Sequence, residues 1–297
     1  MKQQMLVYYG DLKIIEYPGV VIRNGLLVKP IYVYVGELER GLIGGNIPIT
    51  RPVVLGSTGV VKVVEVFDKS TEYTGKMCTV SPLGKDGILG IGEDGLLASY
   101  ASIHSSHVDE ETTNSTPFDA IRPIIKHGAE LAYKSSEPVL IEGCGLIGLA
   151  AGLILRYGGV EPVFYCESSA RNAFGLSFHV NTHISSITKK WNTVILTDTS
   201  MRSKHRLLTG VDYNRLVISK LTLTSWLPIR ETLSSVKVEI VGKNERCDNM
   251  NGDNFKKVLG DVTKNIKVYQ LSKLEDSIGL LPPRGLGSIF IFSPNLQ

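Results

Sequence analysis

The stretch PVLIEGCGLIG, residues 138 to 148, decides the fold. Its apolar beginning predicts a buried strand, and the apolar residues from Leu146 to Tyr157 predict a helix directly after it. The two elements are separated by three glycines at the spacing G-x-G-x-x-G: Gly143, Gly145 and Gly148. A second short strand is predicted from Pro162 to Cys166, so the segment forms a strand, a crossover helix and a parallel strand.

Each glycine has a role that a side chain would prevent. Gly143 allows the tight turn, Gly145 lets the backbone approach a pyrophosphate, and Gly148 lets the helix pack against the strand. The phosphates would bind the amides at the helix start, around Leu146 and Ile147, where the helix dipole favours an anion by up to about 2 kcal/mol. The motif predicts dinucleotide binding. A closely packed sheet that binds no nucleotide is the alternative.

An acidic residue, Glu167, follows the second strand, nineteen positions beyond Gly148. A carboxylate there is expected to accept hydrogen bonds from the ribose hydroxyls. It would repel a 2′-phosphate about 4 Å away by roughly 4 kcal/mol at a surface-like dielectric, so we expect NAD rather than NADP. Arg171 would weaken the preference for NAD if it neutralised the charge of Glu167 or bound a phosphate. The alternative is that Arg171 is a solvent-exposed arginine at the start of a helix.

Further strands are predicted at 193–196, 216–221 and 236–241, in alternation with helices. This alternation predicts a doubly wound parallel sheet with helices on both faces. Thr199 follows the strand at 193–196, and the carboxyl ends of such strands line a ligand crevice. Thr199 is therefore a candidate contact to the cofactor, and a loop cap is the alternative.

Before about Val108 the pattern changes to short β-branched stretches separated by glycine, which predicts a compact all-β unit, a barrel or a sandwich. The polar run at 109–117 is expected to connect two domains. Near the end of the chain, residues 288–292 predict a closing strand.

Composition indicates a cytoplasmic protein with a small-molecule substrate. The chain has 297 residues, 43% of them hydrophobic, which is enough for two cores. Its 32 basic and 29 acidic side chains run in no blocks, so we expect neither a nucleic acid nor a membrane as partner. The four cysteines match neither a disulfide framework nor a metal knuckle, and are interpreted as buried core residues in a reducing compartment: Cys78, Cys144, Cys166 and Cys247.

These features together resemble the medium-chain dehydrogenase/reductase family, which includes the zinc alcohol dehydrogenases. The likeness covers nearly the whole chain. It rests on residues 27–29, 54–56, 59–61, 64–66, 94–95, 98–100, 143–148 and 287–291. The resemblance implies an α/β fold with a GroES-like β-barrel domain at 1–116, completed by 254–297, and a Rossmann dinucleotide-binding domain at 117–253. It also implies a homodimer or homotetramer, paired through a sheet edge near Val236 to Val241.

The chain departs from the zinc members of that family. Those members carry a cysteine and a histidine–glutamate pair where this chain has Gly36, Ser57 and Thr58. None of these three side chains binds zinc as a thiolate or imidazole does. The stretch at 81–95, where a second zinc lobe would lie, contains no cysteine. We therefore expect no metal at either place.

Hydroxyl groups could replace part of the zinc's stabilisation of developing charge. The candidate catalytic residues are Tyr34, Ser57 and Thr58, and ordinary strand and turn roles are the alternative. We expect a zinc-independent NAD(P)-dependent oxidoreductase acting on a small carbonyl, alcohol, quinone or activated alkene. A non-catalytic nucleotide-binding or regulatory protein is a second hypothesis, and a scaffold that binds no nucleotide is a third.

Three histidines are weaker candidates. His104 and His107 are three residues apart on a predicted strand exit, so they need not face one metal site. His127 lies in the helix before the glycine turn, a region that approaches the catalytic metal in zinc relatives. It is either a proton shuttle or a residue on the inner face of an amphipathic helix.

Overall fold

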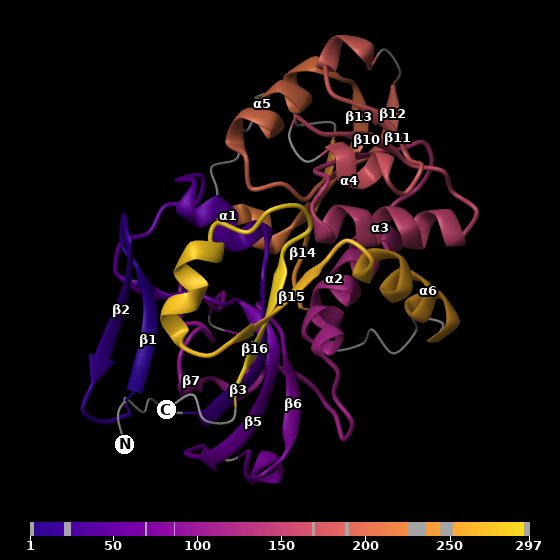
Figure 1. Cartoon of the computed structure of the whole chain (residues 1–297). Helices are drawn as coiled ribbons and strands as arrows, with labels where there is room; N and C mark the ends of the chain where they lie inside the picture. Colours follow the sequence, from indigo (N-terminus) through magenta and orange to yellow (C-terminus); the bar gives the residue numbers. More distant parts are fainter. Residues whose placement is uncertain are drawn as a thin grey trace. The chain divides into compact units, whose positions relative to one another are not determined.

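The computed structural model describes residues 3–20, 25–68, 70–85, 87–167, 170–187, 190–224, 236–243 and 252–293. The chain divides into a first unit, Met1–Pro123 with Ile266–Gln297, and a second unit, Ile124–Asn265 (Figure 1). The sequence places these boundaries at 117 and 254. The return to the first unit comes later because α6 (Gly252–Thr263) packs beside α3 (Leu146–Tyr157) of the second unit.

The first unit is built mainly from antiparallel strands. A three-stranded sheet has the order β2-β1-β4, and a seven-stranded sheet has the order β15-β16-β3-β5-β6-β8, with β7 paired to β3. The strands are β1 (Gln3–Tyr8), β2 (Leu12–Tyr17), β3 (Leu26–Val35), β4 (Val53–Val54), β5 (Thr58–Val66), β6 (Met77–Val80), β7 (Ala101–Ile103), β8 (Val108–Glu111), β15 (Lys267–Leu271) and β16 (Ser288–Phe292). A short helix, α1 (Glu37–Ile43), follows β3.

Strand β16 shows why the chain returns to its first unit. It pairs antiparallel with β3, so that Ile289 lies opposite Tyr34. Ile289 and Phe290 are fully buried, and burying such side chains stabilises a fold by about 2 kcal/mol each. The predicted closing strand at 288–292 is confirmed.

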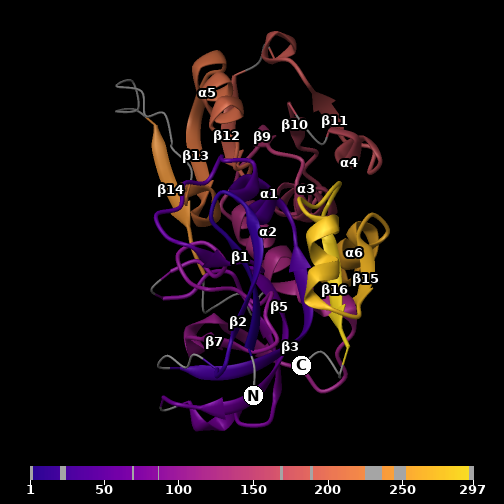
Figure 2. The same ribbon diagram turned by 60° about the vertical axis from the view of Figure 1, so that its left-hand side comes forward.

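The second unit contains a six-stranded parallel sheet with the order β11-β10-β9-β12-β13-β14. Its strands are β9 (Val139–Glu142), β10 (Val163–Tyr165), β11 (His179–Asn181), β12 (Trp191–Leu196), β13 (Tyr213–Ser219) and β14 (Lys237–Val241). Its helices include α2 (Arg122–Tyr133), α4 (Ala170–Phe174) and α5 (Met201–Gly210). Figure 2 shows β11 and β14 at opposite edges of the sheet. The predicted doubly wound parallel sheet is confirmed.

The order of this sheet predicts where a ligand would bind. The chain runs outward from β9 through β10 to β11, and then returns to the other side of β9 to continue with β12. Open sheets of this kind bind ligands at the carboxyl ends of the strands where the order reverses, here between β9 and β12.

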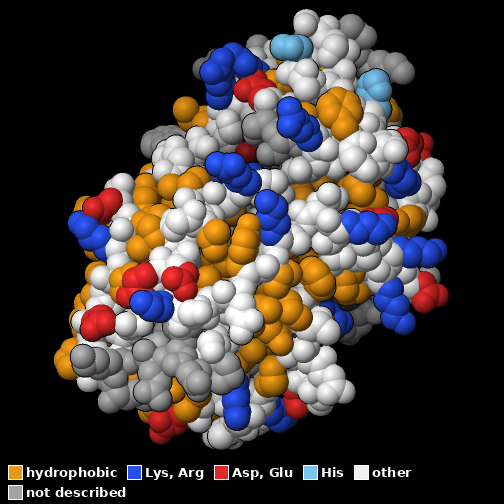
Figure 3. All heavy atoms as spheres, in the orientation of Figure 1, with side chains coloured by type: hydrophobic (Ala, Val, Ile, Leu, Met, Phe, Trp, Pro, Cys, Tyr) orange, Lys and Arg blue, Asp and Glu red, His pale blue; other side chains and the backbone are white. Residues whose placement is uncertain are grey.

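On the face drawn in Figure 3, basic and acidic side chains are interspersed with neutral surface. Among the residues that the structure describes, no helix has the length and apolar character needed to cross a bilayer.

Candidate dinucleotide-binding site

The glycine turn lies between β9 and α3, at the reversal of the strand order. Gly143 has a φ of 107°, in the left-handed region that favours glycine, and a Cβ there would lie 2.6 Å from the Thr197 hydroxyl oxygen. A Cβ at Gly148 would collide with the Gly143 carbonyl oxygen. Gly145 is the N-cap of α3, which begins at Leu146. Glycine at 143 and 148 therefore allows the turn to pack closely at the helix start, where an anion is favoured.

The structure corrects our interpretation of two cysteines. Cys144, inside the turn, and Cys166, at the end of β10, form a disulfide with their Cα atoms 5.8 Å apart. The sequence spacing gave no sign of this pair because the parallel pairing of β9 with β10 brings the two positions together across 22 residues. Cys78 is a free buried thiol, as expected, and Cys247 lies outside the described residues.

Glu167 has partners that sequence reasoning missed. Its Oε1 accepts hydrogen bonds from the Tyr165 hydroxyl and from Arg206 of α5, both at 2.8 Å. The Arg202 Nε lies 4.0 Å from Oε2. Partial burial opposes ionisation, but the hydrogen bonds from Tyr165 and Arg206 outweigh it and lower the pKa of Glu167. Arg171, the basic residue predicted to matter here, is exposed on α4.

Thr199 lies buried between β12 and α5, on the side of the sheet where the glycine turn lies. The cap of α5 is its neighbour Ser200, whose hydroxyl accepts a hydrogen bond from the Ser203 amide. Thr197 fastens the end of β12 to the turn by donating its hydroxyl to the Glu142 carbonyl at 2.7 Å. Thr199 therefore lies between two hydrogen-bonded residues, Thr197 and Ser200.

Beneath the turn lies a cluster of ionisable residues, in which Glu142 and Lys204 are buried and Asp198 is half-buried. Glu142 is fully buried, and its Oε2 accepts a hydrogen bond from the Asp198 amide at 3.2 Å. Burial and the charge of Asp198 raise the pKa of Glu142 to about 8. Lys204 donates to the Thr222 carbonyl at 3.0 Å, and its burial lowers its pKa despite the two carboxylates. Within the described part of the chain, Glu142 Oε1 is buried and has no hydrogen-bond partner.

In the first unit, a buried carboxylate joins two of the positions at which the resemblance predicts zinc ligands in other members of the family. Glu39 of α1 accepts hydrogen bonds from the Gly36 amide at 2.8 Å and the Ser57 amide at 2.9 Å, one on each oxygen. Gly36 has no side chain, and Thr58 donates its hydroxyl to the Val80 and Ala120 carbonyls. Because Glu39 already serves two amides and its neighbours lack thiolate or imidazole, these residues do not fit a zinc ion.

Tyr34 is tied to the return segment of the first unit. Its hydroxyl donates to the Leu286 carbonyl at 2.5 Å, and the side chain is buried. Burial, together with the charges of Glu37 and Glu39, raises the pKa of Tyr34 well above its ordinary value. The hydroxyl groups of Tyr34 and Thr58 thus both donate to main-chain carbonyls. Ser57 is the third candidate donor.

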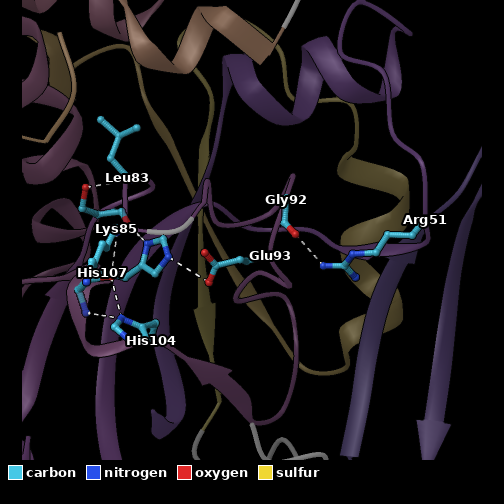
Figure 4. Close-up of polar contacts among 9 residues, drawn as sticks. Arg51, Leu83, Lys85, Gly92, Glu93, His104 and His107 are labelled. Atoms are coloured by element: carbon cyan, nitrogen blue, oxygen red, sulfur yellow. Dashed lines mark hydrogen bonds and ion pairs between the residues drawn. The ribbon is translucent and has the colours of Figure 1, made fainter. Parts of the chain in front are cut away.

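The two paired histidines face different partners (Figure 4). His107 is fully buried, with Nδ1 at 3.0 Å from the Ser81 carbonyl and Nε2 at 3.3 Å from Glu93. His104 turns to Ser106, with Nδ1 at 2.8 Å from its hydroxyl. In the described residues, no cluster of three or more His, Cys, Asp or Glu side chains is arranged to hold a metal ion. The loop at 81–95 is instead fastened by contacts such as that of His107 with Glu93.

His127 lies on the inner face of α2, one of the two interpretations of its sequence position. Its Nε2 is 2.7 Å from the Ser219 hydroxyl at the end of β13, and its Nδ1 is 3.4 Å from Glu130. All three side chains are buried. The histidine therefore ties α2 to the parallel sheet.

Comparison of the sequence with protein-family models and with curated proteins finds no match. Solved structures match nearly the whole chain. A thermostable alcohol dehydrogenase from Pyrobaculum aerophilum aligns with a TM-score of 0.69 at 17% identity, over 98% of this chain and 100% of its own. An acetophenone reductase from Geotrichum candidum in complex with NAD gives 0.68 at 16%, over 98% and 97%. A protein from Sinorhizobium meliloti bound to NADP gives 0.68 at 16%, over 98% and 99%.

At these identities the likeness establishes the fold. The chain has the architecture of the zinc-type alcohol dehydrogenases: a GroES-like β unit with antiparallel sheets, and a Rossmann unit with a six-stranded parallel sheet. The predicted fold class and the structural resemblance to medium-chain dehydrogenases are confirmed.

Proposed function

We propose that this chain is an NAD(P)-dependent oxidoreductase that transfers hydride between a nicotinamide and a small carbonyl, alcohol, quinone or activated alkene, without a catalytic zinc. The observation that carries the proposal is the turn from Gly143 to Gly148, where two glycines let the turn pack closely against the start of a 12-residue helix and the end of β12. Such a turn fits a diphosphate. Fold neighbours with bound NAD and NADP support the same ligand class.

The second unit contributes binding and orientation. The bound nicotinamide supplies or accepts the hydride. The start of α3 holds the diphosphate, and Thr199 contacts the cofactor from the adjacent strand end. Because Glu167 Oε1 already accepts two hydrogen bonds, Oε2 is the oxygen proposed to accept from the ribose. We infer a preference for NAD over NADP that Arg206 moderates by compensating the carboxylate.

The first unit contributes the groups that would face the developing charge. Tyr34 and Thr58 can donate to a substrate oxygen only after giving up their main-chain carbonyls. Ser57 is the donor that we favour, because its amide is held in place by Glu39. Without zinc at these positions, substrates whose negative charge spreads into an enolate need less stabilisation than a simple alkoxide.

A second function, nucleotide binding without catalysis, is supported by one observation. The carboxylate of Glu39 holds together the two segments that carry metal ligands in zinc enzymes of this fold. A bridge of this kind is compatible with a protein that still binds its cofactor but no longer catalyses a reaction. Both functions predict cofactor binding, and only the first predicts turnover.

Calorimetric titration of the purified chain with NADH and NADPH tests the proposal. We expect binding of both, with NADH tighter, and consumption of NADH with at least one acceptor from a panel of aldehydes, ketones, quinones and enones. Gly145→Val should abolish binding by blocking the diphosphate, whereas Gly260→Ala in α6, where a Cβ meets open space, should leave it unchanged. Absence of any nucleotide binding would refute the proposal, and binding without turnover would favour the second function.

A further inference from the structure

The disulfide between Cys144 and Cys166 joins the two segments that form the proposed cofactor site. Cys144 lies between Gly143 and Gly145 of the turn, and Cys166 directly precedes Glu167. Both cysteines are buried. Stabilising disulfides are typical of small domains with little core. This one lies inside a packed βαβ unit, so a contribution to the site explains its position better than a contribution to the core.

The strand end and the turn differ in how firmly they are held. The Cys166 amide donates to the Asn181 carbonyl of β11 at 3.0 Å, which fixes the end of β10 in the sheet. In the turn, the Gly143 amide donates to the Tyr165 carbonyl and the Cys144 carbonyl accepts from Asn172, both at 3.1 Å, and the chain neighbours of Cys144 are glycines. Two thiols need more room than a disulfide, because bonded sulfurs come closer than a non-bonded contact allows. Glycine neighbours give the backbone at Cys144 more freedom than the sheet gives Cys166, so we expect the turn to be the part that moves on reduction.

We propose that Cys144 and Cys166 are a reversible thiol–disulfide pair, and that the oxidised form holds the turn and Glu167 in the geometry that binds the dinucleotide. The part that concerns binding rests on the proposed function. Reduction breaks the bond between the two Sγ atoms. Two thiols of a small reductant such as glutathione supply two electrons and two protons, leave as their own disulfide, and yield two protein thiols. Reduction then lowers dinucleotide affinity, because the site is no longer preorganised.

Binding and reduction are linked in both directions. Both sulfurs are buried, so a reductant reaches them when the turn opens. A dinucleotide bound on the turn keeps it closed and slows the reduction. If the disulfide favours the nucleotide, the nucleotide must favour the disulfide by the same factor.

The experiment titrates the whole protein with NADH before and after treatment with dithiothreitol, with thiols counted by alkylation and mass spectrometry. We expect reduction to weaken NADH binding by about tenfold, as for a site that loses preorganisation. Hydrogen exchange of residues 143–148 should become faster. The double variant Cys144→Ser with Cys166→Ser should show the reduced behaviour with or without dithiothreitol. Cys78→Ser, a free thiol in the other unit, should respond as the native chain does.

The outcomes separate this proposal from the proposed function. Equal or tighter NADH binding after complete reduction would overturn it, as would failure of the pair to re-form a disulfide in air. If the chain binds no dinucleotide in either state, the proposed function fails instead. The thiol–disulfide proposal is then decided by hydrogen exchange of the turn, and unchanged exchange on reduction refutes it.

Discussion

The two units hold their candidate functional segments in place by different means. In the second unit the glycine turn is made by backbone: Gly143 and Gly148 are required because a Cβ would meet other atoms. In the first unit the corresponding segments are held by one side chain, Glu39, which accepts the amides of Gly36 and Ser57. The comparison shows that the glycine turn is fixed by backbone packing, whereas the segments from Gly36 to Ser57 are joined by a buried side chain.

The largest effect is expected from Glu39→Ala. The change leaves two buried amides without an acceptor, and hydrogen bonds to charged groups contribute roughly 1.5–3 kcal/mol each, so the free energy of unfolding should fall by about 4 kcal/mol. Urea denaturation measures this, with the exposed Glu65→Ala as control. A fall as small as that of the control would show that Glu39 does not hold the first unit together.

The disulfide between Cys144 and Cys166 adds a covalent bond to a turn whose shape is otherwise set by its backbone. Closing a loop of about 22 residues stabilises a fold by roughly 3 kcal/mol in the chain-entropy model. Replacing both Cys144 and Cys166 by serine should therefore lower the free energy of unfolding by about 3 kcal/mol under non-reducing conditions. With dithiothreitol, the native chain should unfold at nearly the same urea concentration as the variant, and a large remaining difference would contradict this account.

The comparison also explains which features could be predicted from sequence. The bounds of α3, Leu146–Tyr157, are those expected, because an apolar run between glycines sets them locally. The glycine turn carries its own signal, since each glycine answers a requirement of the backbone. By contrast, α1 is a short polar helix and β11 is a three-residue strand, and neither has a periodicity long enough to detect.

Contacts made across the fold could not be predicted in the same way. Arg206 and Glu167 are 39 residues apart, and their ion pair depends on how α5 lies over the sheet. The partner of Cys144 follows from strand pairing rather than from spacing. Glu39 left one signal, its position three residues after Gly36, which is the spacing at which a side chain can cap the start of its own helix.

The buried carboxyl group of Glu142, beside the glycine turn, should make the stability of the second unit depend on pH. Its pKa rises from 4.5 to about 8 on folding, so its stabilising contribution is complete below about pH 4.5 and is lost as the pH rises to about 8. Unfolding free energies measured across this window should fall as the pH rises. Glu142→Gln keeps the neutral shape and should remove the fall. Lys204, whose pKa is lowered, acts in the opposite direction, so stability of the variant should be flat or rise with pH.

The smallest effect concerns the adenosine end of the cofactor, where side chains rather than backbone would set the preference for NAD over NADP. Arg206→Ala leaves Glu167 with the Tyr165 hydroxyl and with the exposed Arg202 at 4.0 Å. The ratio of the NADPH to the NADH dissociation constant should rise about tenfold, which corresponds to about 1.4 kcal/mol. Arg202→Ala is the matched control on the same helix, because its nitrogen is 4.0 Å away and its side chain is 72% exposed. If the ratio falls in the Arg206 variant, the Glu167 carboxylate faces away from the ribose and Arg206 itself binds the 2′-phosphate of NADPH.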